Sequence, residues 1–221
     1  MSDSPVFITG HSLGAARAAL YAWSRLRRGL RVDGVYLFGC PHPGDRFVAE
    51  TYGLGGLVDK VKKLSLWNRR DPFPALPIDL EFLGEEYVPA FEHEECNEEP
   101  LPLDPWGPFA DHHSELYDAA AKRWPKIADA AAQPADASGL VLRLYRTSDG
   151  WDWVNPVEHA WCAVQQLPSG AKMGVWRGTA DEKDWLDDFD FSQIGVMGAR
   201  VSEGFWKGVA LAGDMMDERL L

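Results

Sequence analysis

The segment that most constrains the fold of this chain lies over residues 5–28. Pro5–Thr9 is a short apolar run, which is typical of a buried strand. A sharp turn follows, Gly10-His-Ser-Leu-Gly14, and Ala, Leu and Trp then recur at helical spacing from Leu13 to Arg28. The pattern therefore predicts a strand that turns abruptly into a helix, the repeating unit of α/β folds.

Further buried strands are predicted over Val35–Phe38 and Val61–Trp67. Their alternation with helices favours a single α/β domain over residues 1–221, with a mostly parallel central sheet flanked by helices. The remaining predicted elements are, in chain order, a helix over 114–132, a linker over 131–139, a strand over 140–146, an antiparallel hairpin over 159–176 and a helix over 202–220.

An acidic stretch interrupts this alternation. Residues 79–104 contain ten carboxylates and no Lys or Arg, and prolines punctuate residues 79–109 without any clear period. We interpret the segment as a long loop, and loops of more than about 12–15 residues often serve as lids or covers. The alternative is a solvated surface loop.

Charge and composition limit the partners. Lys and Arg number 22 against 34 Asp and Glu, so the net charge of −12 disfavours nucleic acid as a partner. No run approaches the ~18 apolar residues of a membrane span, and no signal-peptide pattern opens the chain. We expect a soluble protein of the cytoplasm, or of phage or bacterial origin. Three cysteines without a Cys-x-x-Cys pair predict reduced thiols, and no cofactor or metal is expected.

The turn carries the candidate nucleophile, Ser12. Gly10-His-Ser-Leu-Gly14 matches the pattern G-x-S-x-G, in which a strained turn exposes a serine hydroxyl between strand and helix. In such sites the backbone N–H of the next residue, here Leu13, helps to stabilise the oxyanion. The alternative is an ordinary glycine turn with a passive serine.

A serine nucleophile requires a base and a group that orients the base, in the chain order Ser, acid, His. Asp71 follows the strand over Val61–Trp67 and is the candidate acid, although a plain turn aspartate is the alternative. His112 and His113 come next, just before a predicted helix, and either residue is a candidate base. His42 and His93 lie in a proline-rich turn and in the acidic stretch, and are poorer candidates.

Four motifs in this order, VFITGHSLGAA, VYLFGCPHPGDRF, NRRDPFPALP and DHHSELY, resemble the class 3 lipases of the α/β-hydrolase fold. The resemblance covers about residues 5–125. It implies a catalytic triad of Ser12, Asp71 and His112, because family members show Asp-His with a Tyr a few residues later, and it leaves His113 as the alternative base. Gly14 is followed by Ala-Ala where many members have Gly-Gly or Gly-Ala.

The family also carries an F-R-G-T/S motif, a D-W-x-x-D segment and a Gly-Phe pair, all upstream of its elbow. Here the similar segments Trp176–Thr179, Asp184–Asp187 and Gly204-Phe205 lie downstream. Residues 140–221 thus resemble the family's N-terminal half, and residues 1–130 its C-terminal half with the triad. We interpret this order as a circular permutation; a misplaced start in a circular genome and a fusion of two fragments are the alternatives. The resemblance further implies that Thr179 is the second oxyanion donor.

The sequence therefore predicts a serine hydrolase that cleaves carboxylic esters, a lipase or esterase, through an acyl-enzyme. The expected substrate is a small-molecule ester or a lipid, with transient contact to a lipid interface. A phospholipase or acyltransferase with the same triad is one alternative, and a catalytically silent binding or assembly module is another. The oligomeric state stays open.

Overall fold

The computed structural model describes residues 4–53, 61–76, 88–90, 92–98, 107–125, 131–155, 161–178 and 192–221. In chain order the strands are β1 Val6–His11, β2 Gly34–Phe38, β3 Lys62–Asn68, β4 Glu94–Cys96, β5 Trp153–Asn155, β6 Cys162–Gln166, β7 Lys172–Trp176, β8 Gln193–Val196 and β9 Ala199–Ser202. The helices are α1 Leu13–Arg27, α2 Arg46–Gly53, α3 Ser114–Arg123, α4 Pro134–Arg146 and α6 Glu203–Leu220, with 3₁₀ turns η1 Phe73–Ala75 and η3 Gly107–His112.

A seven-stranded sheet in the order β4-β3-β2-β1-β7-β6-β5 forms the centre of the described structure. The five strands from β4 to β7 run parallel, and β6 and β5 continue the sheet antiparallel. The carboxyl ends of β1 and β3 therefore lie at the same edge, where ligands and catalytic groups gather in open α/β sheets. This arrangement confirms the predicted mostly parallel sheet and is consistent with an α/β-hydrolase fold.

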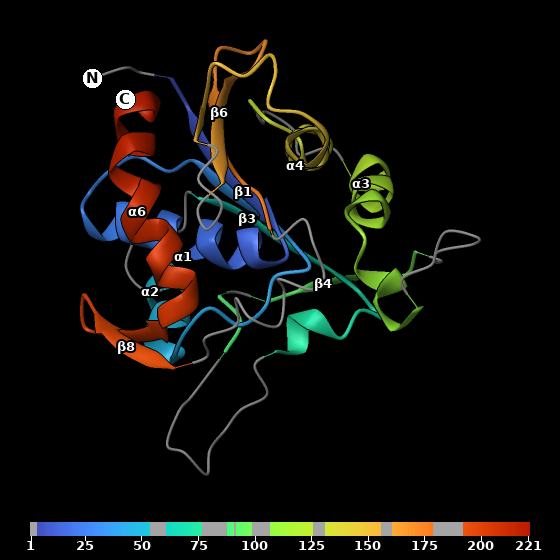
Figure 1. Ribbon diagram of the computed structural model, residues 1–221, viewed down its shortest axis with the longest axis horizontal. Helices are drawn as coiled ribbons and strands as arrows, with labels where there is room; N and C mark the ends of the chain where they lie inside the picture. Colours follow the sequence, from blue (N-terminus) through green and yellow to red (C-terminus); the bar gives the residue numbers. More distant parts are fainter. Residues whose placement is uncertain are drawn as a thin grey trace.

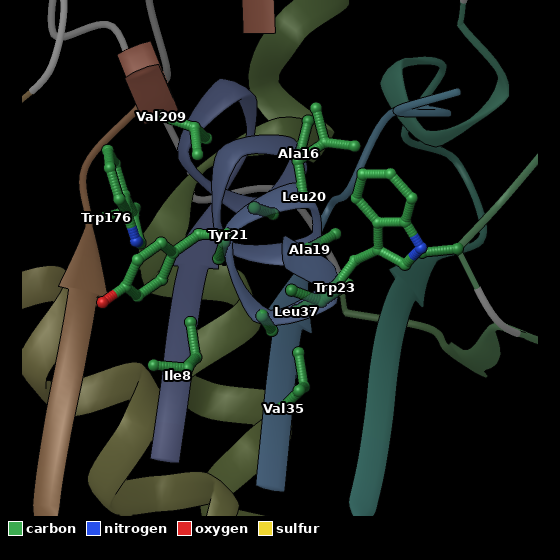
Figure 2. Packing of buried hydrophobic residues seen from close by; sticks show 14 of the residues in the cluster. Ile8, Ala16, Ala19, Leu20, Tyr21, Trp23, Val35, Leu37, Trp176 and Val209 are labelled. Atoms are coloured by element: carbon green, nitrogen blue, oxygen red, sulfur yellow. The ribbon is translucent and has the colours of Figure 1, made fainter. Parts of the chain in front are cut away.

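Helices cover both faces of the sheet (Figure 1). On one face, α1 and α6 bury a cluster that includes Ile8 of β1 and Trp176 of β7. Figure 2 shows α1 lying across this face, with Tyr21 directed towards Trp176 and Ile8. On the other face, α3 and α4 pack over Phe7 and Tyr36 in a second cluster. Burial of β1 on both faces explains its continuous apolar sequence.

The predicted linker over 131–139 and strand over 140–146 are wrong from residue 134 onwards, because α4 spans Pro134–Arg146. Pro134 opens this helix, and Gln133 and Asp136 form a capping box. Its buried residues include Ala137, Val141 and Leu144, a helical spacing. A short apolar run fits a strand or a buried helix equally well, and here the capping residues decide.

Two other predictions need correction. The helix predicted over 114–132 ends at Arg123, because Trp124 precedes Pro125 and adopts an extended conformation. Within the loop predicted over 79–109, Glu94–Cys96 is instead strand β4, paired in parallel with the end of β3. Most of the remaining acidic stretch, and with it the predicted lid, lies outside the described residues.

The other predicted elements are confirmed: the strands β1, β2 and β3, the helix α1, the antiparallel pair β6–β7 and the C-terminal helix α6. The side chain of Ser202 caps α6 by accepting a hydrogen bond from the Phe205 N–H. The cysteines Cys40, Cys96 and Cys162 are free and buried. Among the helices in the described ranges, none has the length and apolar character needed to cross a bilayer.

Candidate active site

The elbow places Ser12 between β1 and α1 with φ 59° and ψ −134°, a conformation that L-residues rarely adopt. Glycine is required on both sides. A Cβ on Gly10 would lie 2.2 Å from the carbonyl oxygen of Gly14, and one on Gly14 would lie 2.4 Å from that of Trp176. The two glycines therefore let the first turn of α1 touch both its own strand and the end of β7.

Ser12, His112 and Asp71 lie in one line of hydrogen bonds. His112 Nε2 is 2.7 Å from Ser12 Oγ, and His112 Nδ1 is 2.6 Å from Asp71 Oδ2. A carboxylate only accepts hydrogen bonds, so Nδ1 carries the ring proton and Nε2 is left to accept the serine hydroxyl. The elbow, the loop after β3 and the η3–α3 junction each supply one of the three residues.

The local structure around Asp71 aims its carboxylate at His112. Asp71 is 1% exposed, and its Oδ1 accepts a hydrogen bond from the Phe73 N–H at 2.9 Å. The Phe73 ring lies against the His112 ring, with centroids 4.1 Å apart. Trp67 Nε1 donates to the Asp71 backbone carbonyl at 2.8 Å. These contacts hold the segment that follows β3, which contains the motif NRRDPFPALP, in place beside His112.

His113, the alternative base, lies elsewhere. It is the residue before α3, and its Nδ1 is 3.9 Å from the Glu115 carboxylate. His112, by contrast, contacts both the Ser12 hydroxyl and the Asp71 carboxylate. The geometry thus favours His112 over His113 as the partner of Ser12.

Of the two predicted oxyanion donors, Leu13 and Thr179, the structure describes only Leu13. Leu13 is the first residue of α1, where backbone N–H groups lack acceptors within the helix. Thr179 lies outside the described residues. Its neighbour Gly178 packs tightly against the elbow, since a Cβ there would lie 3.0 Å from Ser12 Cβ and 2.8 Å from the His11 carbonyl oxygen. The end of β7 therefore reaches the nucleophile.

The sequence did not indicate several buried or partly buried residues around the site. Asn68, at the end of β3, donates from its side chain to the carbonyl of Asp111 at 3.1 Å and so holds the residue before His112. The His11 ring contacts the His112 backbone carbonyl through Nε2 and the Tyr145 hydroxyl through Nδ1. No local pattern marks these residues, and only the position of His11 within the elbow turn offers a signal.

Two other histidines form a separate group. His93 Nδ1 lies 2.7 Å from Ser65 Oγ, and the His93 ring stacks on His42 with centroids 6.5 Å apart. Burial, with His42 adding to it, lowers the pKa of His93 to about 4. No group of three or more His, Cys, Asp or Glu suited to holding a metal ion occurs in the described part of the chain.

Comparison with known proteins supports the resemblance seen in the sequence. A search of curated proteins finds no match. The family model described as "Lipase (class 3)" matches residues 1–81, a stretch that contains the elbow, strands β1 to β3 and Asp71. That family implies a hydrolase acting on esters. On its N-terminal 81 residues, this chain therefore matches the class 3 lipases.

Proposed function

We propose that the protein is a serine hydrolase that cleaves carboxylic esters through an acyl-enzyme, with Ser12 as nucleophile, His112 as base and Asp71 as the orienting acid. The observation that carries the proposal is the continuous line from Ser12 Oγ through both ring nitrogens of His112 to Asp71 Oδ2, with distances of 2.7 and 2.6 Å. The class 3 lipase match over residues 1–81 supports the substrate class.

The chemistry follows from these contacts. Ser12 Oγ attacks the acyl carbonyl carbon while His112 Nε2 takes the hydroxyl proton, and Asp71 stabilises the resulting imidazolium. The tetrahedral intermediate then collapses, the C–O bond to the alcohol breaks, and His112 returns the proton to the leaving alkoxide. Water, deprotonated by His112, attacks the acyl-enzyme in the same way and releases the acid.

The negative charge on the carbonyl oxygen requires donors already in place. We assign one to the backbone N–H of Leu13 and the second to Thr179. The contact of Gly178 with Ser12 supports the assignment of Thr179, because Gly178 is the residue directly before Thr179 and lies against the nucleophile. Removal of one oxyanion donor typically lowers kcat about 10²–10³-fold.

Permutation is the second part of the proposal. The end of α6 lies near the start of β1, because both contact Lys172 at the start of β7: Val6 pairs with Lys172 in the sheet, and α6 is visible beside the sheet in Figure 1. Lys172 Nζ, at the start of β7, donates to the Arg219 carbonyl at 3.0 Å. In the unpermuted order, α6 would lead directly into β1, and the segment between α3 and α4 would hold the chain ends.

The permutation is testable by rearranging the chain. A gene that begins at residue 131, joins residue 221 to residue 1 through a short glycine linker and ends at residue 125 should give the same unfolding midpoint and the same ester turnover. Loss of folding in this variant, with a folded wild type, would contradict the proposal of interchangeable chain order.

The catalytic proposal is tested by fluorophosphonate labelling with mass-spectrometric location of the adduct. Ser12 should be modified, and Ser12→Ala should not react. Ser65→Ala is the matched control, because Ser65 is also a buried serine next to an imidazole but lies outside the elbow. A folded wild-type protein that does not react would favour the binding module. If Ser12 reacts, an ester chain-length series with and without a lipid interface separates esterase from lipase.

A further inference from the structure

His11, the second residue of the elbow, lies between two polar groups from distant parts of the chain. Its Nε2 is 2.8 Å from the backbone carbonyl oxygen of His112, and its Nδ1 is 3.1 Å from the hydroxyl of Tyr145 on α4. The side chain is 5% exposed. The imidazole thus connects the base of the proposed triad to helix α4.

The partners fix the protonation state of this ring. A carbonyl oxygen only accepts, so His11 Nε2 carries the proton and donates to His112, and Nδ1 must accept from the Tyr145 hydroxyl. Burial, with the neighbouring His112 ring adding to it, holds the pKa of His11 well below its usual range. The ring is therefore neutral at pH 7 and has one donor and one acceptor, both used.

Tyr145 extends the connection to the end of β7. The Gly178 backbone lies against the Tyr145 hydroxyl, since a Cβ on Gly178 would come within 2.6 Å of that oxygen. Arg177, the residue before, is held by its guanidinium over the Trp161 ring, 3.3 Å from the centroid. One chain of contacts therefore runs from Gly178 through Tyr145 and His11 to the backbone of His112.

Both ends of this series of contacts, Gly178 and the His112 backbone, lie next to proposed catalytic groups. Gly178 precedes Thr179 in sequence, and the His112 carbonyl belongs to the residue whose ring contacts Ser12. His11 and Tyr145 contact each other, the His112 backbone carbonyl and Gly178. Any effect of these two side chains on turnover would be exerted through the residues that they hold.

We propose that His11 and Tyr145 are positioning residues that fix the His112 backbone relative to the end of β7. They would thereby keep the His112 imidazole and the end of β7 correctly placed relative to Ser12. This inference rests on the proposed function. It assigns to the second residue of the elbow a role as hydrogen-bond donor to the base's own backbone.

Three substitutions test the inference. His11→Phe keeps a ring against His112 and Tyr117, whose ring centroids lie 4.8 and 5.4 Å away, but removes both hydrogen bonds. His11→Gln retains an N–H donor for the His112 carbonyl. Tyr145→Phe removes only the hydroxyl. Tyr36→Phe is the matched control, since Tyr36 is a buried tyrosine of the same core cluster whose hydroxyl donates to Ala132, away from the site.

The readouts are kcat and KM for a soluble ester, the rate of fluorophosphonate labelling of Ser12, and the unfolding midpoint. His11→Phe and Tyr145→Phe should lower kcat and the labelling rate by about 10- to 100-fold with KM unchanged, because small displacements of catalytic groups have effects of this size. His11→Gln should recover most of the loss, and Tyr36→Phe should match the wild type.

Three results would overturn the inference: a wild-type kcat in both His11→Phe and Tyr145→Phe, a His11→Gln variant as slow as His11→Phe, or a Tyr36→Phe variant as slow as Tyr145→Phe. If His11→Phe does not fold, Tyr145→Phe carries the test alone. Failure of the proposed function is distinguishable, because then the wild-type protein itself would neither turn over esters nor label at Ser12.

Discussion

The hydroxyl of Tyr117 donates a hydrogen bond to Oδ2 of Asp71, and both side chains are buried. Burial and the adjacent carboxylate raise the pKa of Tyr117 well above its usual range, so the hydroxyl stays protonated and remains a donor. The Tyr117 hydroxyl oxygen also accepts a hydrogen bond from the Asn68 N–H, at 3.2 Å. Tyr117 thereby ties the last residue of β3 to the acid that contacts His112.

Tyr117→Phe should therefore affect both stability and turnover. A hydrogen bond to a charged group contributes about 1.5–3 kcal/mol, and its loss leaves a buried carboxylate oxygen with one partner fewer. We expect the free energy of unfolding to fall by about 2 kcal/mol and kcat to fall with KM unchanged. Urea unfolding and ester turnover measure the two effects, and a variant that equals the wild type in both would refute the role.

The strained backbone of Ser12 predicts an unusual order of stability. Residues held at positive φ of this kind cost about 1–3 kcal/mol, and glycine avoids most of that cost. Ser12→Gly should thus be more stable than Ser12→Ala by about 1 kcal/mol, although both variants lack the nucleophile. Ser24, inside α1, provides the matched pair, where Gly should be less stable than Ala by about 1 kcal/mol. Thermal or urea unfolding of the four variants decides, and the same order at both serines would argue against strain.

The elements that the sequence predicted well are those set by local sterics and periodicity. The strand, turn and helix around Ser12 follow from a short apolar run, two glycines and an Ala-rich segment, and each of these acts within a few residues. Asp71 was predictable for a similar reason, because chain order and the end of a strand place an acid at the carboxyl edge of the sheet.

What the sequence did not reveal depends on distant contacts. Strand β4 has only three residues, Glu94–Cys96, of which two are exposed glutamates, and pairing with β3 makes it a strand. The apolar run over 140–146 fits a strand as well as a helix, and the capping box of Gln133 and Asp136, which lies outside that run, makes it helical. His11 and Tyr145 are 134 positions apart, so their contact exists only once α4 has packed beside the elbow.

A buried ion pair joins the first and last helices. Arg25 on α1 pairs with Asp217 on α6, with side chains 1% and 10% exposed, and Tyr21 and Arg28 also bond to this carboxylate. Removal of one partner from such a pair leaves a buried charge without compensation, at a cost of about 3–5 kcal/mol. Asp217→Asn should lower the free energy of unfolding by this amount.

Asp214→Asn is the control for that substitution, because the Asp214 side chain is 95% exposed and lies 3.6 Å from Arg28. Surface pairs contribute about 0–1 kcal/mol, so this variant should unfold almost as the wild type does. The double variant Arg25→Met/Asp217→Leu should regain much of the stability, since it removes both buried charges and leaves only Arg28, which reaches solvent, without this partner. Equal losses in Asp217→Asn and Asp214→Asn would show that the buried pair contributes little.

One buried histidine, His11, and one partly buried histidine, His93, predict how stability depends on pH. Burial lowers the pKa of His93 to about 4 and that of His11 well below its usual range, whereas in the unfolded chain both titrate near 6.5. Below pH 6.5 the unfolded state therefore binds protons that the folded state does not, and stability falls as the pH falls. Each such histidine adds a slope of about 1.4 kcal/mol per pH unit, which for His93 ends near pH 4. The free energy of urea unfolding measured between pH 5 and 6 should thus fall less steeply in His93→Gln than in the wild type, by one proton. An unchanged slope in His93→Gln would mean that His93 is protonated in the folded protein, contrary to its partly buried contacts with Ser65 and His42.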